Sequence, residues 1–300
     1  MKAMILAAGF GTRLRPLTDK KPKALMPVAN VPIIGRVIEY VKNQGVTEIV
    51  VNAHHHQKQI VDYLNKGGQF GVPIEVRVEP EILGTGGGIK NSSDFWNADP
   101  FIVINSDILT DIDLRPAYER HRKSQSLATL ILHDYKPFNQ IEIDNDNNLV
   151  DIAPKQCPGR FAFTGIHILR PEILSYIPDA GFSDIIDCYR KLIQSKKPPK
   201  AYLSEGHTWR DIGTVSHYVQ ANRDLLKEGH YVMGTDCLIE PSVKLCDWAV
   251  IGQGSRIEED AEITRSILWQ GVHIRKGLRV IDSIVTAFAK VERDLQGEIC

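Results

Sequence analysis

The 300-residue sequence has no paired cysteines, no excess of basic charge and no long apolar run, and each absence excludes a class of protein. Its five scattered cysteines, without CxxC spacing, are typical of reduced thiols in a cytosolic protein rather than of a disulfide framework. A net charge of -1 argues against nucleic acid or a membrane surface as a partner. No apolar stretch approaches the roughly 20 residues of a membrane helix. We therefore expect a cytoplasmic globular protein, and we interpret the short apolar start as a buried strand rather than a signal peptide.

Up to about residue 110, short apolar runs alternate with segments of helical periodicity. Alternating strands and helices predict crossover connections, and therefore an α/β fold with a Rossmann-like, mixed but mostly parallel sheet. The ligand of such a sheet binds beyond the carboxyl ends of its strands. The expected strands are residues 3–7, 48–52, 74–78 and 101–105, and the expected helices are residues 31–43 and 57–64.

Beyond about residue 232 the apolar residues recur every six positions, which fits neither a helix nor an ordinary strand. Repeats of six residues are typical of a left-handed parallel β-helix, in which one aliphatic side chain of each unit fills the interior. The alternative is a coincidental β-meander. We predict two domains, residues 1–230 and residues 231–300. The expected interior positions are Ile239, Leu245, Ile251, Ile257 and Ile263, with Trp269 in the next slot.

A glycine turn follows the first expected strand. Gly9 and Gly11 let the backbone approach a phosphate chain closely. The turn is not a dinucleotide fingerprint, because Leu14 stands where a third glycine is needed, and no P-loop lysine follows. The guanidinium of Arg13 can hold a pyrophosphate in a bidentate fork, and Lys23 supplies a point charge for the α-phosphate.

A carboxylate ends the fourth expected strand. Asp107 is placed to hold Mg²⁺, which takes one or two protein carboxylates together with phosphate oxygens. Asp211, in the segment WRDIGT, is its expected partner. The alternative for Asp107 alone is a cap of a turn or helix.

Four glycines lie within residues 84–88, after the third expected strand. They leave bare backbone against which a base and a ribose can pack. A flexible surface loop is the alternative.

Residues 1–28, with AAGFGTRLRPLT and PKALMPV, closely resemble the signature of the sugar-1-phosphate nucleotidyltransferases. Several members of that family also carry a left-handed β-helix, so the resemblance extends over the whole chain. It implies Mg²⁺ held by Asp107 and Asp211, and catalytic roles for Arg13, Lys23 and Lys155. It implies nucleotide-binding roles for Ala7, Ala8, Gly9, Gly11, Thr12, Glu81, Gly84, Thr85 and Gly86, and sugar-binding roles for Gly87, Thr164 and Gly165.

The sequence departs from the family pattern in the two segments that are expected to bind the sugar phosphate. Pro154 and Gln156 flank Lys155 where many relatives have Glu-Lys-Pro, and Phe163 and Thr164 replace the Asn-Ala of an Asn-Ala-Gly segment. The Phe-Thr-Gly version looks more like the thymidylyltransferase and muramate branches of the family.

These features predict an enzyme that joins a nucleoside triphosphate to a sugar 1-phosphate by attack on the α-phosphorus and releases pyrophosphate. The segment VNAHH at residues 51–55 and the C-terminal repeat favour GTP and mannose 1-phosphate as the substrates. The alternatives are a UTP- or dTTP-dependent enzyme acting on glucose 1-phosphate or N-acetylmuramate 1-phosphate, and a non-catalytic sensor of sugar nucleotides. We expect no nucleic-acid or membrane partner, and a short β-helix could support a homo-oligomer.

Overall fold

The computed structural model describes residues 1–65, 70–226 and 230–300. The chain forms two compact units. The first comprises Met1–Phe10, Pro22–Ala24 and Ile34–Asp211, and the second comprises Gly11–Lys21, Leu25–Ile33 and Ile212–Cys300. In the described part of the chain, no helix combines the length and the apolar character needed to cross a membrane. The boundary near residue 230 remains a prediction.

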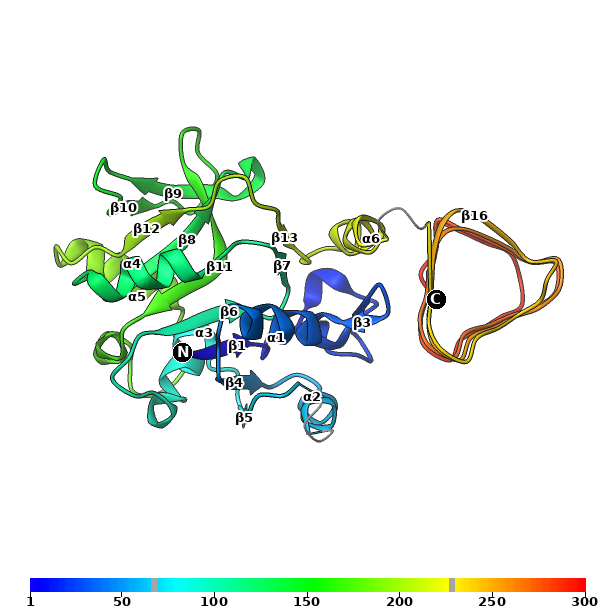
Figure 1. Cartoon of the computed structure of the whole chain (residues 1–300), viewed down its shortest axis with the longest axis horizontal. Helices are drawn as coiled ribbons and strands as arrows, with labels where there is room; N and C mark the ends of the chain where they lie inside the picture. The colour runs from blue at the N-terminus through cyan, green and yellow to red at the C-terminus, as the bar shows by residue number, and fades with distance from the viewer. Residues whose placement is uncertain (66–69, 227–229) are drawn as a thin grey trace. The chain divides into compact units, whose positions relative to one another are not determined.

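A nine-stranded mixed sheet runs through the first unit in the order β10-β9-β11-β6-β1-β4-β5, and β8 pairs with both β11 and β12 (Figure 1). Strands β6, β1, β4 and β5 are parallel, whereas β11 runs antiparallel to β6 and β8. This confirms the predicted α/β fold with a mixed sheet. The strands are β1 (Lys2–Leu6), β4 (Glu48–Ala53), β5 (Ile74–Val78), β6 (Phe101–Asn105), β8 (Ala128–His133), β9 (Asn139–Ile143), β10 (Leu149–Ile152), β11 (Phe161–Leu169) and β12 (Lys200–Leu203).

The central strands are buried on both faces, as their continuous apolar sequence predicts. Met4, Val50 and Val103 belong to one core cluster, which also contains residues of helix α5. Their chain neighbours Ile5 and Ile104 point to the opposite face and are equally inaccessible to solvent. The helices of this unit are α1 (Ile33–Asn43), α2 (Gln57–Leu64), α3 (Gly84–Lys90), α4 (Arg115–Lys123) and α5 (Ile185–Gln194), with short 3-10 helices η2 (Lys23–Leu25), η3 (Ser93–Phe95), η4 (Lys136–Phe138) and η5 (Pro171–Tyr176).

The predicted helix at residues 31–43 begins two residues late. Ala29 and Asn30 both have positive φ, the geometry of a tight hairpin turn. This turn joins β2 (Pro27–Val28) to β3 (Val31–Pro32), so Val31 belongs to a strand and helix α1 starts at Ile33.

The C-terminal strands of the second unit are parallel and wind into a coil, which Figure 1 shows end on as a three-sided figure. Lys244 pairs with Glu262, eighteen residues on, and Arg256 pairs with His273, seventeen residues on. The offset of eighteen residues equals three units of six, so the parallel strands are compatible with the predicted β-helix, and the hexapeptide repeat itself remains a prediction. The left-handedness of the coil remains a prediction.

The elements of the second unit are η1 (Thr12–Leu14), β2, β3, α6 (Val215–Asp224), β14 (Tyr231–Met233), β15 (Leu238–Ile239), β16 (Lys244–Ile251), β17 (Arg256–Ile257), β18 (Glu262–Leu268), β19 (His273–Ile274), β20 (Arg279–Ile281), β21 (Ile284–Val285), β22 (Lys290–Val291) and β23 (Leu295–Gln296). The last described element of the first unit is β13 (Trp209–Asp211), which pairs with β7 (Ile108–Thr110).

The interior of the coil follows the predicted six-residue rhythm through Ile251, Ile257 and Ile263. The prediction for Trp269 is wrong, because Leu268 fills the next interior slot. The ladder between β16 and β18 slips by one residue, so Leu268 pairs with Ile251. Trp269 is nevertheless buried, and its indole N–H donates to the Tyr218 hydroxyl of α6 at 2.8 Å.

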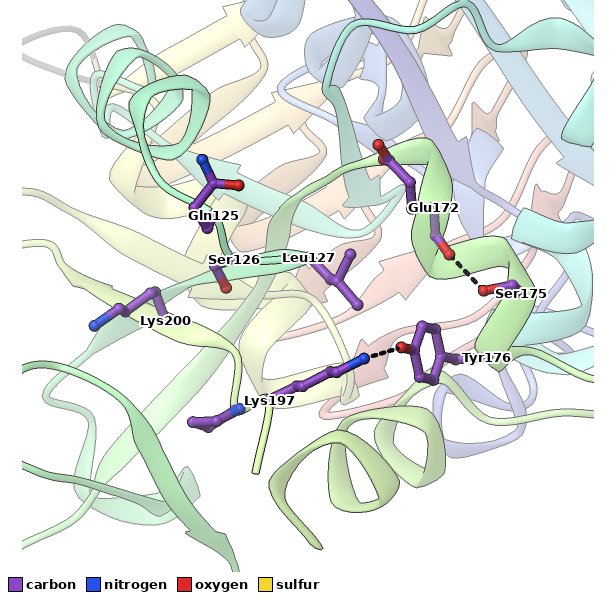
Figure 2. A pocket seen from close by; sticks show the side chains of 9 residues that line it. Gln125, Ser126, Leu127, Glu172, Ser175, Tyr176, Lys197 and Lys200 are labelled. Atoms are coloured by element: carbon purple, nitrogen blue, oxygen red, sulfur yellow. Dashed lines mark hydrogen bonds between the residues drawn. The ribbon is translucent and has the colours of Figure 1, made fainter. Parts of the chain in front are cut away.

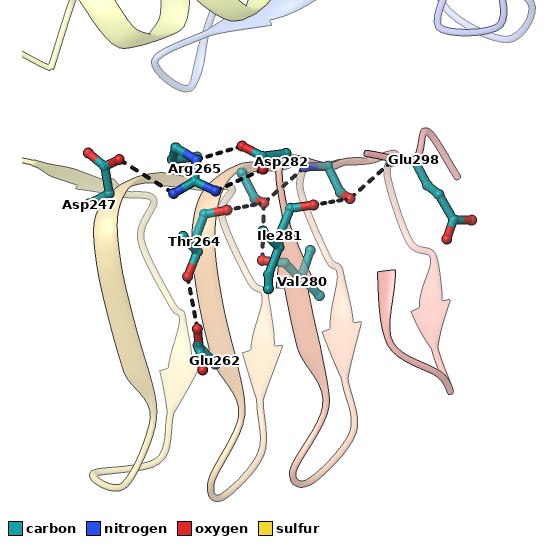
Figure 3. Close-up of polar contacts among 10 residues, drawn as sticks. Asp247, Glu262, Thr264, Arg265, Val280, Ile281, Asp282 and Glu298 are labelled. Atoms are coloured by element: carbon teal, nitrogen blue, oxygen red, sulfur yellow. Dashed lines mark hydrogen bonds and ion pairs between the residues drawn. The ribbon is translucent and has the colours of Figure 1, made fainter. Parts of the chain in front are cut away.

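The corners of the coil use the left-handed backbone conformation at equivalent positions of successive turns. Asp247, Arg265 and Asp282 occupy one such corner, with φ of 63°, 45° and 49°. Their alternating charges form a ladder across three turns (Figure 3). The Arg265 Nε lies 2.6 Å from Asp282 Oδ1, and an Arg265 terminal nitrogen lies 3.7 Å from Asp247 Oδ2.

Two glycines near another corner allow a test of coil packing. A Cβ added to Gly252 would lie 2.4 Å from the backbone nitrogen of Gln270 on the next turn, whereas a Cβ on Gly254 meets nothing within 4 Å. Gly254 has a φ of 66°, so Gly254→Ala should cost only about 1 kcal/mol of conformational strain. We expect Gly252→Ala to lower the urea midpoint of the C-terminal unfolding transition clearly further than Gly254→Ala. Equal midpoints would contradict this account of the turn-to-turn contact.

Candidate active site

The carboxyl ends of four parallel strands meet at one edge of the sheet. Leu6 at the end of β1 pairs with Asn52 on β4 and with Asn105 on β6. Ala53 at the end of β4 pairs with Val78 on β5. The segments that follow these strands therefore lie together, at the place where sheets of this kind bind their ligands.

A chain of hydrogen bonds links three of these strand ends. The backbone N–H of Ala7 donates to Asn52 Oδ1 at 2.8 Å, and Asn52 Nδ2 donates to Glu79 Oε1 at 2.7 Å. The other carboxylate oxygen of Glu79 accepts from the backbone N–H of Leu83 at 3.1 Å. Glu79 is fully buried and Asn52 is 2% exposed. A buried carboxylate is tolerated only when its oxygens are hydrogen-bonded, so these bonds fix Ala7, Asn52 and the start of α3 together.

The glycines before and within α3 serve close packing. A Cβ on Gly88 would lie 2.7 Å from Asn52 Nδ2, and one on Gly86 would lie 2.9 Å from the Ser183 hydroxyl. The Ser183 carbonyl accepts from the N–H groups of Gly86 and Gly87 at 2.8 and 3.2 Å. The first turn of α3 is thus packed against residues 181–184, which explains most of the glycine run without a ligand.

The predicted nucleotide-binding residues of this unit lie in different surroundings. Ala7 and Ala8 are buried at the end of β1, whereas Gly9 is exposed and has open space around its Cα. Glu81 is exposed. The Thr85 hydroxyl donates to Asp184 and accepts from the N–H of Ile185, so this side chain anchors α5.

A lysine and a carboxylate meet at the same edge of the sheet. Lys23, in η2, and Asp107, between β6 and β7, form an ion pair in which both side chains are 14% exposed. Asp211 ends β13 and pairs with Ile108, the residue after Asp107. The two predicted metal ligands are therefore carried by adjoining strands, beside the predicted catalytic lysine.

The carboxylates fit a magnesium ion in number and kind. Within residues 1–65, 70–226 and 230–300, no group of three or more His, Cys, Asp or Glu side chains could hold a metal by itself. Mg²⁺ needs only one or two protein carboxylates when phosphate oxygens complete its shell. Asp107 and Asp211 are of the kind and number that such a site would need, and their role as ligands remains a prediction.

The expected sugar-binding residues lie on β11. Gly165 has a φ of 75°, and a Cβ there would lie 2.6 Å from the Asn105 side-chain nitrogen. Thr164 is fully buried and its hydroxyl donates to the Ile131 carbonyl at 2.7 Å, so its side chain cannot reach a ligand without breaking that bond. Its own carbonyl accepts from the indole N–H of Trp209 at 2.9 Å. Thr164 therefore orients Trp209, two residues before Asp211.

Four further predicted residues belong to other segments of the chain. Lys155 is exposed in the turn after β10. Gly11, Thr12 and Arg13 belong to the second unit, where Gly11 takes the left-handed conformation that begins η1. Their roles remain predictions.

Sequence reasoning did not single out Asn52 and Glu79. The sequence nevertheless contained a signal. Asn52 is the last residue but one of β4, whose other residues are largely apolar, and Glu79 directly follows β5. His54 adds a contact at this edge, since its Nδ1 lies 2.8 Å from the Glu79 carbonyl oxygen. Its ring also packs edge-on against Phe10, with centroids 5.5 Å apart.

The hydrogen-bond chain can be tested by stability measurements. Asn52→Ala would leave a buried carboxylate oxygen and the Ala7 N–H without their partner, at a cost of roughly 3 kcal/mol in the free energy of unfolding. Asn97→Ala, an exposed asparagine bonded to Asp99, is the control and should cost little. In a double-mutant cycle, Asn52→Ala with Glu79→Ala should cost less than the sum of the single changes. Strictly additive losses would show that the two side chains do not depend on each other.

Comparison with known proteins identifies the family of this chain. The Nucleotidyl transferase family model matches residues 2–228. The N-acetylmuramate alpha-1-phosphate uridylyltransferase of Neisseria meningitidis serogroup B is 36% identical, covering 74% of this chain and 96% of that protein. The mannose-1-phosphate guanyltransferase of Candida albicans is 31% identical, covering 82% of this chain and 73% of that protein. The crystal structure of HddC from Yersinia pseudotuberculosis is similar with a TM-score of 0.66 and 28% identity, over 75% of this chain and 99% of that one.

The family model spans most of the chain, and two relatives above 30% identity carry out nucleotidyl transfer according to their names. The structure places Lys23 against Asp107 after β6, and Asp211 on the strand that pairs with β7. This chain is an enzyme of the sugar-1-phosphate nucleotidyltransferase family.

Proposed function

We propose that this enzyme transfers a guanylyl group from GTP to mannose 1-phosphate and releases pyrophosphate. The observation that carries the proposal is the cluster of Lys23, Asp107 and Asp211 at the strand ends. The choice of sugar is supported by similarity to the Candida albicans mannose-1-phosphate guanyltransferase, which extends over 82% of the chain.

Uridylyl transfer is the second candidate. The relative with 36% identity is named as an N-acetylmuramate alpha-1-phosphate uridylyltransferase, and the Phe163-Thr164-Gly165 segment resembles that branch of the family.

The reaction needs little proton transfer. A phosphate monoester is already an anionic nucleophile, so an oxygen of the sugar phosphate can attack the α-phosphorus in line while pyrophosphate leaves from the opposite side. The barrier lies in bringing two polyanions together and in the charge that spreads over the transferring group. Fixed positive groups and exact positioning supply most of the catalysis.

Lys23 provides such a fixed positive group. Its ion pair with Asp107 and its 14% exposure restrict the ammonium to the strand ends, where it can neutralise the α-phosphate. We propose that Arg13 binds the pyrophosphate and that Lys155 binds the sugar phosphate. The exposed Gly9 offers bare backbone to the phosphate chain.

We propose Mg²⁺ as the cofactor, held by Asp107 and Asp211. When bound, the ion supplies charge neutralisation between the nucleotide and the sugar phosphate. Asn52 and Glu79 hold the backbone around the phosphate site, and Thr164 holds Trp209 beside the second carboxylate.

We further propose that the enzyme acts in the cytoplasm, that its catalytic domain ends near residue 230, and that the C-terminal coil supports a homo-oligomer. The coil has the register of a hexapeptide β-helix, and its first and last strands have one unpaired edge each within the described residues. Edges of this kind are suited to contacts between copies of a chain.

The metal assignment predicts the behaviour of one variant. Asp107→Ala should lower turnover at least a thousandfold, because it removes one of two proposed ligands, while the melting temperature stays near that of the wild type. Asp99→Ala removes an exposed carboxylate and should leave turnover unchanged. Wild-type turnover by a folded Asp107→Ala variant would contradict the proposal that Asp107 is a magnesium ligand.

Substrate choice is tested by pyrophosphate release with Mg²⁺ from a panel of pairs. GTP, UTP, dTTP, CTP and ATP are each combined with mannose 1-phosphate, glucose 1-phosphate and N-acetylmuramate 1-phosphate. The highest kcat/KM is expected for GTP with mannose 1-phosphate. A preference of tenfold or more for a UTP pair would replace the proposal with the uridylyl alternative.

A further inference from the structure

A cavity lies at the amino ends of β8 and β12, within the first unit. Its volume is about 540 Å³, and three segments line it. Gln125, Ser126 and Leu127 come from the loop before β8, the 3-10 helix η5 supplies three further side chains, and Lys197, Pro198 and Lys200 precede or begin β12. Figure 2 shows the side chains of these segments arranged around Leu127.

This cavity is remote from the candidate active site by sheet topology. Strand β8 is antiparallel to β11, and β11 is antiparallel to β6, so β8 and β6 run in the same direction. The active site lies beyond the carboxyl end of β6, whereas the cavity lies before the amino end of β8. The two sites are therefore at opposite edges of one sheet.

Lys197 has no acidic partner among the described residues, whereas Lys200 acts on Asp144, whose pKa is lowered first by hydrogen bonds from Asn148 and also by the charge of Lys200. The Lys197 ammonium donates to the Tyr176 hydroxyl at 3.0 Å and lies 5.7 Å from that ring, and the Lys200 ammonium donates to the Asp146 carbonyl at 3.1 Å. In the part of the chain that the structure describes, neither lysine forms an ion pair. A neutral phenol leaves the charge of Lys197 uncompensated, and an anion is the ligand that would compensate it.

A further positive charge is fixed to the same loop. The Arg170 guanidinium donates to the carbonyls of Arg122 and Ser124, at 3.0 and 2.8 Å, just before Gln125. The pKa of buried His121, in the same region, is lowered to about 4 by burial and then by the charge of Arg170. Arg170 therefore holds a positive charge beside the start of the loop that carries Gln125.

The remaining polar groups of the cavity suit hydroxyls rather than a bare polyanion. Among the described residues, the Gln125 amide and the Glu172 carboxylate make no hydrogen bond, and both residues are exposed and line the cavity. A carboxylate repels a phosphate but accepts readily from a hydroxyl. Leu127 and Pro198 add an apolar surface against which a carbon skeleton can pack.

From these groups we infer that the cavity binds a small hydroxyl-bearing phosphate ester, such as a phosphorylated sugar or polyol. Lys197 holds the phosphate, and Glu172 and Gln125 hold the hydroxyls. The site is separate from the one that binds the two substrates. The proposal does not depend on which nucleotide or sugar the active site uses.

Calorimetric titration of the whole chain tests the site, with glucose 6-phosphate, glycerol 3-phosphate and inorganic phosphate as probes. We expect an ester to bind the wild type more tightly than inorganic phosphate does. Lys197→Ala should weaken ester binding at least tenfold, and Glu172→Ala should reduce the advantage of the ester over inorganic phosphate. Melting temperatures equal to that of the wild type would establish that both variants are folded.

Two lysine variants serve as matched controls. Lys191→Ala removes an exposed lysine of α5 outside the cavity, and Lys23→Ala removes the lysine of the active site. Both should bind the ester like the wild type. The inference is overturned if no probe binds, if Lys197→Ala binds like the wild type, or if Lys23→Ala abolishes binding, since the last result would assign the ligand to the active site.

Discussion

The candidate active site depends on one buried carboxylate. Glu79 has no access to solvent, so its charge is tolerable only because Asn52 and the Leu83 N–H donate to it. Asn52 in turn accepts from Ala7. These bonds connect the ends of β1, β4 and β5 with the start of α3. Every segment proposed to contact the nucleotide in the first unit is attached to one of these points, so the geometry of the site follows from them.

A second constraint is electrostatic. The chain has a net charge near zero, yet the reaction brings two phosphate-bearing substrates together. Lys23 supplies positive charge where the strands end, and its ion pair with Asp107 limits its movement. A lysine that a carboxylate already holds in place loses less conformational entropy when it binds a phosphate than a lysine on a mobile surface loop does. At the opposite edge of the sheet, the charge of Lys197 is likewise held in place, by its hydrogen bond to the Tyr176 hydroxyl.

Strands were predictable from the sequence because they depend on local pattern. The expected strands at residues 74–78 and 101–105 coincide with β5 and β6. The roles of the two aspartates remain predictions, although Asp211 pairs with Ile108, the residue after Asp107. The partnership of Asn52 with Glu79 was not predictable, since it joins side chains on different strands whose contact depends on the sheet order. Thr164 was expected to face a sugar, but its hydroxyl is bonded inside the sheet. Trp269 was misplaced because a one-residue slip between β16 and β18 changes which side chain enters the coil.

The corners of the C-terminal coil restrict how this part of the chain can change in length. Left-handed residues recur at Asp236, Gly254, Gly271 and Phe288, and again at Asp247, Arg265 and Asp282. An insertion or deletion of a complete turn keeps each corner above its counterpart and each aliphatic side chain inside. A change of two or three residues would rotate the following strands and expose their interior side chains, unless it formed a loop at a corner. Length variation in this region should therefore occur in whole turns or as loops at the corners.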